Sequence, residues 1–116
     1  MRILDVDSAP PSEARHHTGH LIEGEAVGAL FVSTTGAVMF TDRRILLLFR
    51  EHLLEEKSET SSYSYRAVTH FSIQEGSGSR STLRIWLGEE QHPLHLRANA
   101  GTDLRDVQRL LAEKLI

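Results

Sequence analysis

The feature that most constrains the fold is an apolar run with a polar turn at its middle, residues 36–49, with the sequence GAVMFTDRRILLLF. Ala37–Thr41 and Arg44–Arg50 have the aliphatic and aromatic content of strands, and Asp42 and Arg43 lie between them. Arginine rarely adopts a positive φ, so we expect a type I turn with a bulge between the two strands. The sequence therefore predicts a β-hairpin at the centre of a mainly β domain.

Further strand patterns lie on both sides of this hairpin. Ala26–Ser33 is apolar on both parities, and Thr69–Ile73, Leu83–Leu87 and Leu94–Leu96 alternate between apolar and polar residues. Glu51–Ser62 is polar, which predicts a loop or a distorted edge strand. Together these patterns predict about seven short antiparallel strands.

The period of the apolar residues changes after residue 101. Thr102 stands where it can cap a helix. The residues at helical spacing are Leu104, Val107, Leu110, Leu111 and Leu115. The chain is therefore expected to end with one amphipathic helix that covers the sheet.

Residues 1–20 contain Pro10 and Pro11 and lack a sustained period. This predicts a loosely ordered N-terminal arm over residues 1–20, followed by a single domain over residues 21–116. His16 and His20 have the spacing of two metal ligands on a helix. We expect solvated histidines in a mobile arm instead.

Composition excludes several classes of protein. The chain has no cysteine, a formal net charge of −3, and no apolar run longer than Ile45–Phe49. These properties predict a soluble, cytoplasmic protein that does not bind nucleic acid, and they do not indicate membrane association. No nucleophile elbow is present, and Gly76–Ser79 lacks the ending of a phosphate-binding loop, so we expect no enzyme activity, no cofactor and no metal site.

Two surface features are candidates for binding. Arg43 and Arg44 at the hairpin tip are the candidate anion contact, with Arg66, Arg80 or Arg84 as further cations that the fold can bring near. Salt bridges to Asp42 and its neighbours are the alternative use of the two tip arginines. The candidate interface consists of Val27, Ala29, Phe31, His70 and Trp86.

The orientation of Trp86 stays open at this point. It shares its parity with Arg84 and opposes Leu83, Ile85 and Leu87. In a sheet with one buried face the indole points outward, whereas strong curvature of a barrel would bury it.

Four segments resemble the bacterial pleckstrin-homology (PH) domain family: Phe40–Ile45, Tyr65–Ile73, Leu83–Trp86, and Gly101–Leu104 with Val107 and Gln108. The resemblance covers residues 21–116 and implies a PH-like, partly open barrel or sandwich with one C-terminal capping helix. It also implies assembly into rings of identical subunits and no enzyme activity. The chain departs from the family in lacking glycines over residues 52–57 and in carrying Ser64 where the family usually has proline.

These observations predict a non-catalytic module that forms a homo-oligomer, in which a ring is one arrangement, and presents a surface to a protein partner. The alternative is a peripheral membrane or anionic-ligand binding module that uses Arg43 and Arg44.

Overall fold

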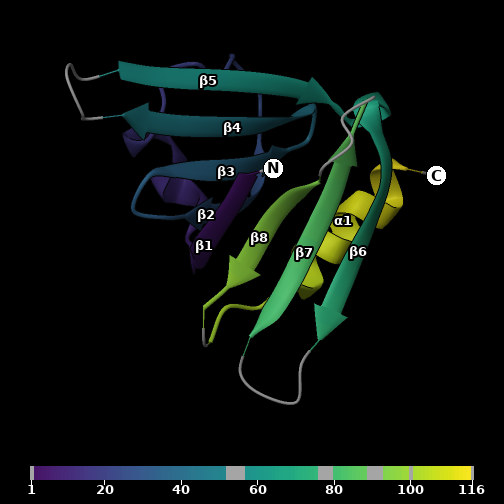
Figure 1. Ribbon diagram of the computed structural model, residues 1–116. Helices are drawn as coiled ribbons and strands as arrows, with labels where there is room; N and C mark the ends of the chain where they lie inside the picture. Colours follow the sequence, from purple (N-terminus) through teal and green to yellow (C-terminus); the bar gives the residue numbers. More distant parts are fainter. Residues whose placement is uncertain (1, 52–56, 76–79, 89–92, 100, 116) are drawn as a thin grey trace.

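A single curled β-sheet with one α-helix forms the part of the chain that the structure describes, residues 2–51, 57–75, 80–88, 93–99 and 101–115 of a computed structural model (Figure 1). The strands are β1 (Arg2–Ala9), β2 (Val27–Val32), β3 (Gly36–Thr41), β4 (Arg44–Glu51), β5 (Lys57–Ser64), β6 (Val68–Glu75), β7 (Ser81–Leu87) and β8 (Leu94–Ala98). Two 3-10 helices, η1 (Pro11–His16) and η2 (Tyr65–Ala67), precede β2 and β6, and the helix α1 (Arg105–Lys114) ends the described chain.

The eight strands lie in the order β5-β4-β3-β2-β1-β8-β7-β6, so β5 and β6 are the two ends of the sheet. Every pair of neighbours is antiparallel except β1 and β8, which are parallel. In Figure 1 the strands β3–β5 lie across the view, while β6–β8 are steep, with β7 pointing up and β6 and β8 pointing down, and α1 lies beside them. The expected mainly β, partly open barrel with one C-terminal helix is confirmed, with one strand more than the seven expected and one parallel pair where antiparallel strands were expected.

The additional strand is β1, and it corrects the expectation of a loosely ordered arm. Leu4 and Val6 are buried in the core, while Asp5 and Asp7 between and after them are exposed. Residues 2–6 pair with β8, and residues 7–9 pair with β2, so β1 joins the two halves of the sheet. Aspartate is uncommon in strands, but here both carboxylates point to solvent, where they cost little.

The inner core lies inside the curl. Alternate residues of the strands contribute to it, including Phe31, Phe40, Ile45, Leu83, Ile85 and Leu96, together with Leu104, Val107 and Leu111 from the helix. The helical pattern is therefore confirmed, but its cap is not. Thr102 accepts a hydrogen bond from the backbone N–H of Ser8, and Leu104 stands at the N-cap without a side-chain hydrogen bond.

A second core lies on the outer face of β2–β4. It consists of Ala14, Leu30, Ala37, Met39, Leu46 and Leu48, with Ala9, Leu21, Val27 and Val32 packed against it. Both faces of the central hairpin are thus buried within one chain. The cover is the segment that includes η1, which the sequence analysis assigned to the arm.

The central hairpin turns at Asp42 and Arg43. Its register runs without a shift from Gly36 opposite Phe49 to Phe40 opposite Ile45, and no described non-glycine residue has a positive φ. A mirror-image turn is therefore excluded at these two residues, as expected. The expected bulge is not in this hairpin, because the register shift lies between Val27 and Ala29 of the neighbouring strand β2.

The polar segment after the hairpin forms a regular edge strand over its described part. β5 pairs with β4 in continuous register from Lys57 opposite Glu51 to Ser64 opposite Arg44. Ser64 is the N-cap of η2 and has φ −64°, a value that proline also adopts, and its side chain accepts a hydrogen bond from the N–H of Arg66. Residues 52–56 and the expected linker Gly76–Ser79 lie outside the described residues.

Candidate functional site

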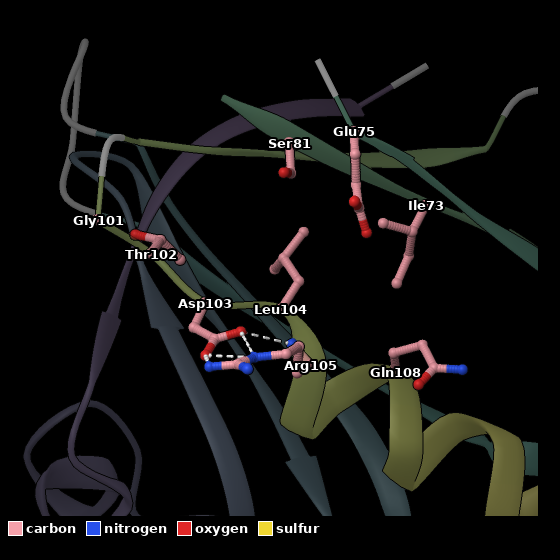
Figure 2. A pocket seen from close by; sticks show the side chains of 9 residues that line it. All are labelled: Ile73, Glu75, Ser81, Gly101, Thr102, Asp103, Leu104, Arg105 and Gln108. Atoms are coloured by element: carbon pink, nitrogen blue, oxygen red, sulfur yellow. Dashed lines mark hydrogen bonds and ion pairs between the residues drawn. The ribbon is translucent and has the colours of Figure 1, made fainter. Parts of the chain in front are cut away.

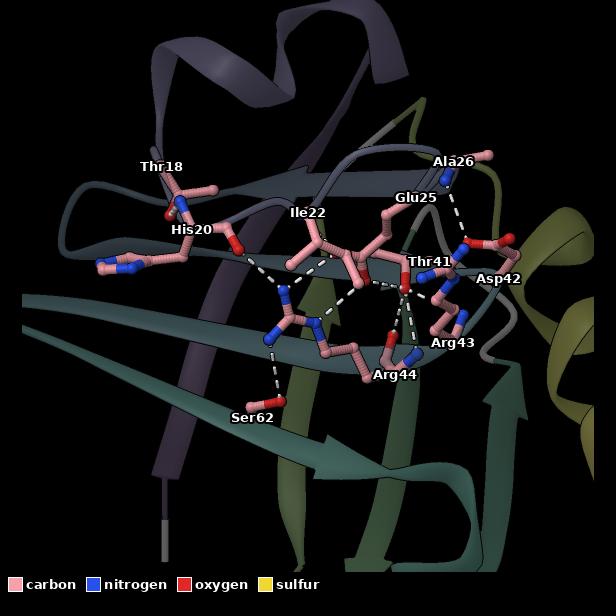
Figure 3. Close-up of polar contacts among 10 residues, drawn as sticks. All are labelled: Thr18, His20, Ile22, Glu25, Ala26, Thr41, Asp42, Arg43, Arg44 and Ser62. Atoms are coloured by element: carbon pink, nitrogen blue, oxygen red, sulfur yellow. Dashed lines mark hydrogen bonds and ion pairs between the residues drawn. The ribbon is translucent and has the colours of Figure 1, made fainter.

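Arg44, one of the two predicted anion contacts, is paired inside the chain. Its Nη2 and Nε atoms each lie 2.9 Å from an oxygen of Glu25, which gives a two-point ion pair (Figure 3). Nη2 also donates to the backbone carbonyl of His20 at 2.8 Å, and Nη1 donates to Ser62 at 3.3 Å. The prediction of an anion contact is wrong for Arg44, because Glu25 and these neighbours occupy its guanidinium.

Glu25 is the buried partner in this pair, with a side chain that is 0% exposed. The hydrogen bonds from Arg44 lower the pKa of its carboxyl to about 2, against a smaller opposing effect of desolvation. Thr41 donates to the same carboxylate at 2.7 Å, and the N–H of Ile22 donates at 3.2 Å. The cluster holds residues 20–25 against the hairpin. It therefore acts as a clasp that fastens the segment around η1 to the outer face of β2–β4.

Arg43 has a different environment from that of Arg44. Its side chain is exposed, and it lines a pocket of about 510 Å³ together with Arg66 and Lys114. The pocket lies where the β3–β4 turn, η2 and the end of α1 meet. Of the further cations considered in the sequence, the structure brings Arg66 to Arg43, whereas Arg84 lies in β7 opposite Ser72 and His95.

The predicted interface residues separate into two groups. Ala29 and Phe31 are 8% and 2% exposed and belong to the inner core, and Val27 packs half-buried on the outer core. The interface prediction is wrong for Ala29 and Phe31, because the chain itself buries both side chains.

His70 and Trp86 lie together on the outer face at the other half of the sheet. Their rings are stacked, with centroids 4.1 Å apart and planes 16° apart. Trp86 is half-buried and His70 is exposed, and the two residues are opposite each other in the β6–β7 ladder. The open question about Trp86 is thereby answered: the indole faces outward, and the imidazole covers part of it.

A larger pocket, of about 650 Å³, lies between the ends of β6 and β7 and the beginning of α1 (Figure 2). Ile73 and Glu75 extend from β6 toward the helix, and Gln108 lies below them. At its rim the carboxylate of Asp103 pairs with Arg105 at 2.8 Å, so these two charges compensate each other. This pocket was not predictable from the sequence, because its walls come from segments far apart in the chain.

The histidines at the start of the chain do not converge on a metal-binding cluster. His16 ends η1, and His20 offers its backbone carbonyl to Arg44. Over residues 2–51, 57–75, 80–88, 93–99 and 101–115, no group of three or more potential ligand side chains is positioned to hold an ion. In the same ranges no helix is long and apolar enough to cross a membrane.

Comparison with known proteins agrees with this architecture. The chain superposes on the crystal structure of a DUF1696 family protein with a pleckstrin-homology domain from Shewanella loihica, with a TM-score of 0.76, 19% identity, and coverage of 97% of this chain and 98% of the other. It also superposes on a pleckstrin homology domain from Shewanella amazonensis, with a TM-score of 0.68, 22% identity, and coverage of 89% and 95%. These likenesses show the fold.

Sequence comparison gives the family. An uncharacterized Bacillus subtilis protein, YjqA, is 30% identical over 95 residues, which cover 79% of this chain and 76% of the relative. Residues 4–115 match the family described as the bacterial PH domain. The match includes most of β1, in agreement with the place of that strand in the sheet. The chain therefore belongs to the bacterial PH domain family.

Proposed function

We propose that this chain is a non-catalytic interaction module that assembles with copies of itself through the two ends of its sheet. The observation that carries the proposal is the strand order, in which β5 and β6 each have one neighbour among the strands that the structure describes. The backbone groups on the other side of an end strand are the usual means by which a strand of another chain is added. The outer face of β2–β4 no longer supports self-association, because the chain covers it.

The two end strands have complementary surfaces. Each strand has 8 residues. Near the end at β6, the outer face carries the bulky stack of His70 on Trp86. On the outer face at β5 the side chains are small and hydroxylated, from Ser58, Thr60, Ser62 and Ser64. We therefore expect β5 of one copy to pair with β6 of the next, where the small residues leave room for the two rings.

Pairing of unlike ends has a consequence for the assembly. Every copy then uses one surface to bind its predecessor and another to bind its successor, which generates a ring when the rotation closes. Assembly of this kind fits the resemblance stated from the sequence. The repeated surface is offered to a protein partner in the cytoplasm, a compartment that the absence of cysteine favours.

Light scattering on variants with one blocked end tests this proposal. Along a strand the backbone N–H groups alternate in direction. Of two adjacent residues in an end strand, one therefore directs its N–H group away from the neighbouring strand of the same chain. Proline is placed at Thr60 or at Ser61 to block β5, and at Gln74 or at Glu75 to block β6. From each pair the variant with the higher thermal midpoint is used, since proline there has removed no hydrogen bond within the chain.

The expected masses distinguish unlike pairing from like pairing. The particle mass of the wild-type protein should exceed the 13.0 kDa mass of one chain, and each blocked variant alone should be monomeric. A mixture of the β5-blocked and β6-blocked variants should give a dimer of twice that mass, because one intact β5 and one intact β6 remain. A monomeric wild type contradicts assembly, and a single blocked variant that still forms dimers contradicts the pairing of unlike ends.

A further inference from the structure

The pocket at the β3–β4 turn concentrates positive charge in a chain that is negative overall. Its cavity of about 510 Å³ is lined by three cationic side chains, from Arg43, Arg66 and Lys114, and by one carboxylate, from Asp42. The formal net charge of the whole chain is −3. The positive charge in the pocket is therefore a local property that the fold creates by bringing three separate segments together.

The charges of the two arginines are not neutralised within the described part of the chain. There, neither guanidinium has an ion pair or a hydrogen bond to an acceptor, in contrast to Arg44, which is held by Glu25. Asp42 uses one carboxylate oxygen to accept a hydrogen bond from the N–H of Ala26 at 3.0 Å (Figure 3). Two guanidinium groups thus line the pocket with free donors.

The surroundings of the pocket are held in place by hydrogen bonds. The N–H of Arg43 donates to the hydroxyl of Thr41 at 3.1 Å, and the N–H of Arg66 donates to the hydroxyl of Ser64 at 3.1 Å. Lys114 donates to the backbone carbonyl of Asp42 at 2.6 Å, with its Nζ 5.8 Å from the centroid of the Tyr65 ring. A site whose backbone is already ordered loses less entropy when a ligand binds.

We propose that this pocket binds a phosphate group. The planar fork of each guanidinium matches two phosphate oxygens, and the lysine adds a point charge. A phosphate monoester carries close to two negative charges and three acceptor oxygens, which suits two arginines whose guanidinium groups are unpaired among the described residues. The site uses Arg43 with Arg66 and Lys114, and Arg44 does not take part. The pocket also touches the last residue of β5, Ser64, and the first residue of β6, Val68, so it adjoins the two end strands where η2 connects them.

Calorimetric titration with inorganic pyrophosphate at low ionic strength tests the site. The test variant is Arg43→Ala combined with Arg66→Ala. The matched control is Arg15→Ala combined with Arg109→Ala, which removes the same charge from two exposed residues outside the pocket lining. We expect saturable binding by the wild type and the control, and binding weaker by about tenfold or more in the test variant, because charge-assisted hydrogen bonds are lost.

Thermal unfolding of both double variants separates loss of the site from loss of the fold. Equal weakening in the test and control variants would mean that pyrophosphate senses only the general charge, and it overturns the proposal. So does the absence of saturable binding by the wild type. Lys114→Met provides a second variant on a different element, and it should also weaken binding, because its ammonium lines the same pocket.

A second arm identifies the source of the phosphate. The protein is sedimented with phosphatidylglycerol vesicles. If sedimentation is lost in the test variant and is inhibited by pyrophosphate, the site binds lipid headgroups. Binding of pyrophosphate without sedimentation assigns it to a soluble phosphate compound. Vesicle binding that is unchanged in the test variant, with no titration by pyrophosphate, contradicts the phosphate site.

Discussion

Arg44 in β4 and Glu25 before β2 form a two-point ion pair in which the carboxylate is 0% exposed and the arginine side chain 23% exposed. A pair this deeply buried is costly to break from one side, because the remaining charge stays away from water. The pair also connects the hairpin to the segment that covers its outer face. The stability of the domain should therefore depend on the charge of Glu25.

Replacing Glu25 with glutamine should destabilise the fold by about 3 kcal/mol at neutral pH. Urea unfolding monitored by circular dichroism measures this difference. Aspartate at the exposed position 5 provides the control: Asp5→Asn loses an ion pair to Arg97 in which both side chains are about half exposed, and it should cost less than about 1 kcal/mol. Similar losses in the two variants would contradict a clasp role for Glu25.

The same carboxylate predicts how stability depends on pH. In the folded protein the pKa of Glu25 is lowered from 4.5 to about 2, so folding favours its ionised form. The stability it contributes is present above its unfolded pKa and is lost as the pH falls from 4.5 toward 2. The difference in unfolding free energy between wild type and Glu25→Gln should thus be smaller at pH 3 than at pH 7. A constant difference between them would disprove this linkage.

Leu4 and Ile3 are adjacent residues that test whether β1 belongs to the core. Leu4 is 4% exposed and Ile3 is 47% exposed. Leu4→Ala should cost about 2–5 kcal/mol, whereas Ile3→Ala should cost less than about 0.5 kcal/mol. Denaturant unfolding of the two variants measures the contrast. If β1 were a loosely ordered arm, both substitutions would have equally small effects.

The central hairpin, the later strands and the helix were predictable from the sequence because each shows its own period over several residues. β1 was not, because Leu4 and Val6 alternate with Asp5 and Asp7 only over a short range before Pro10 and Pro11. A strand of this kind becomes stable through its neighbours β2 and β8, and local periodicity does not contain that information. The outer cover was missed for the same reason, since Ala14 and Leu21 show no pattern by themselves.

The candidate site was predictable only in part. The tip arginines are visible in the sequence, but which one stays free depends on Glu25, which precedes Arg44 by many residues. Arg66 and Lys114 come from other elements, so their meeting with Arg43 required the fold. Local pattern gives the residue types at a turn, whereas the pairing of charges depends on long-range contacts.

Gly36 at the start of β3 should tolerate no side chain. A Cβ atom built at this position would lie 1.8 Å from the backbone carbonyl oxygen of Leu48, a contact that side-chain rotation cannot relieve. Gly36→Ala should therefore lower the free energy of unfolding by about 3 kcal/mol or more, which is the upper end of the range for overpacking. Gly19→Ala is the matched control, because nothing lies within 4 Å of the added carbon. Thermal unfolding of both variants measures the contrast, and an unchanged midpoint for Gly36→Ala would contradict the close approach of β3 and β4.

The fluorescence of Trp86 reports directly on the β6 end of the sheet, because the sequence contains one tryptophan and its ring is stacked on that of His70 in β6. If β5 of another copy pairs with β6, water is displaced from the exposed side of this stack. The emission of Trp86 should then shift to shorter wavelength as the protein concentration rises across the range in which light scattering detects assembly. The β6-blocked proline variant should show no such shift, and neither should the β5-blocked variant alone. Restoration of the shift when the two variants are mixed would link the tryptophan to the pairing of unlike ends, whereas a concentration-independent spectrum in an assembling wild type would move the interface away from β6.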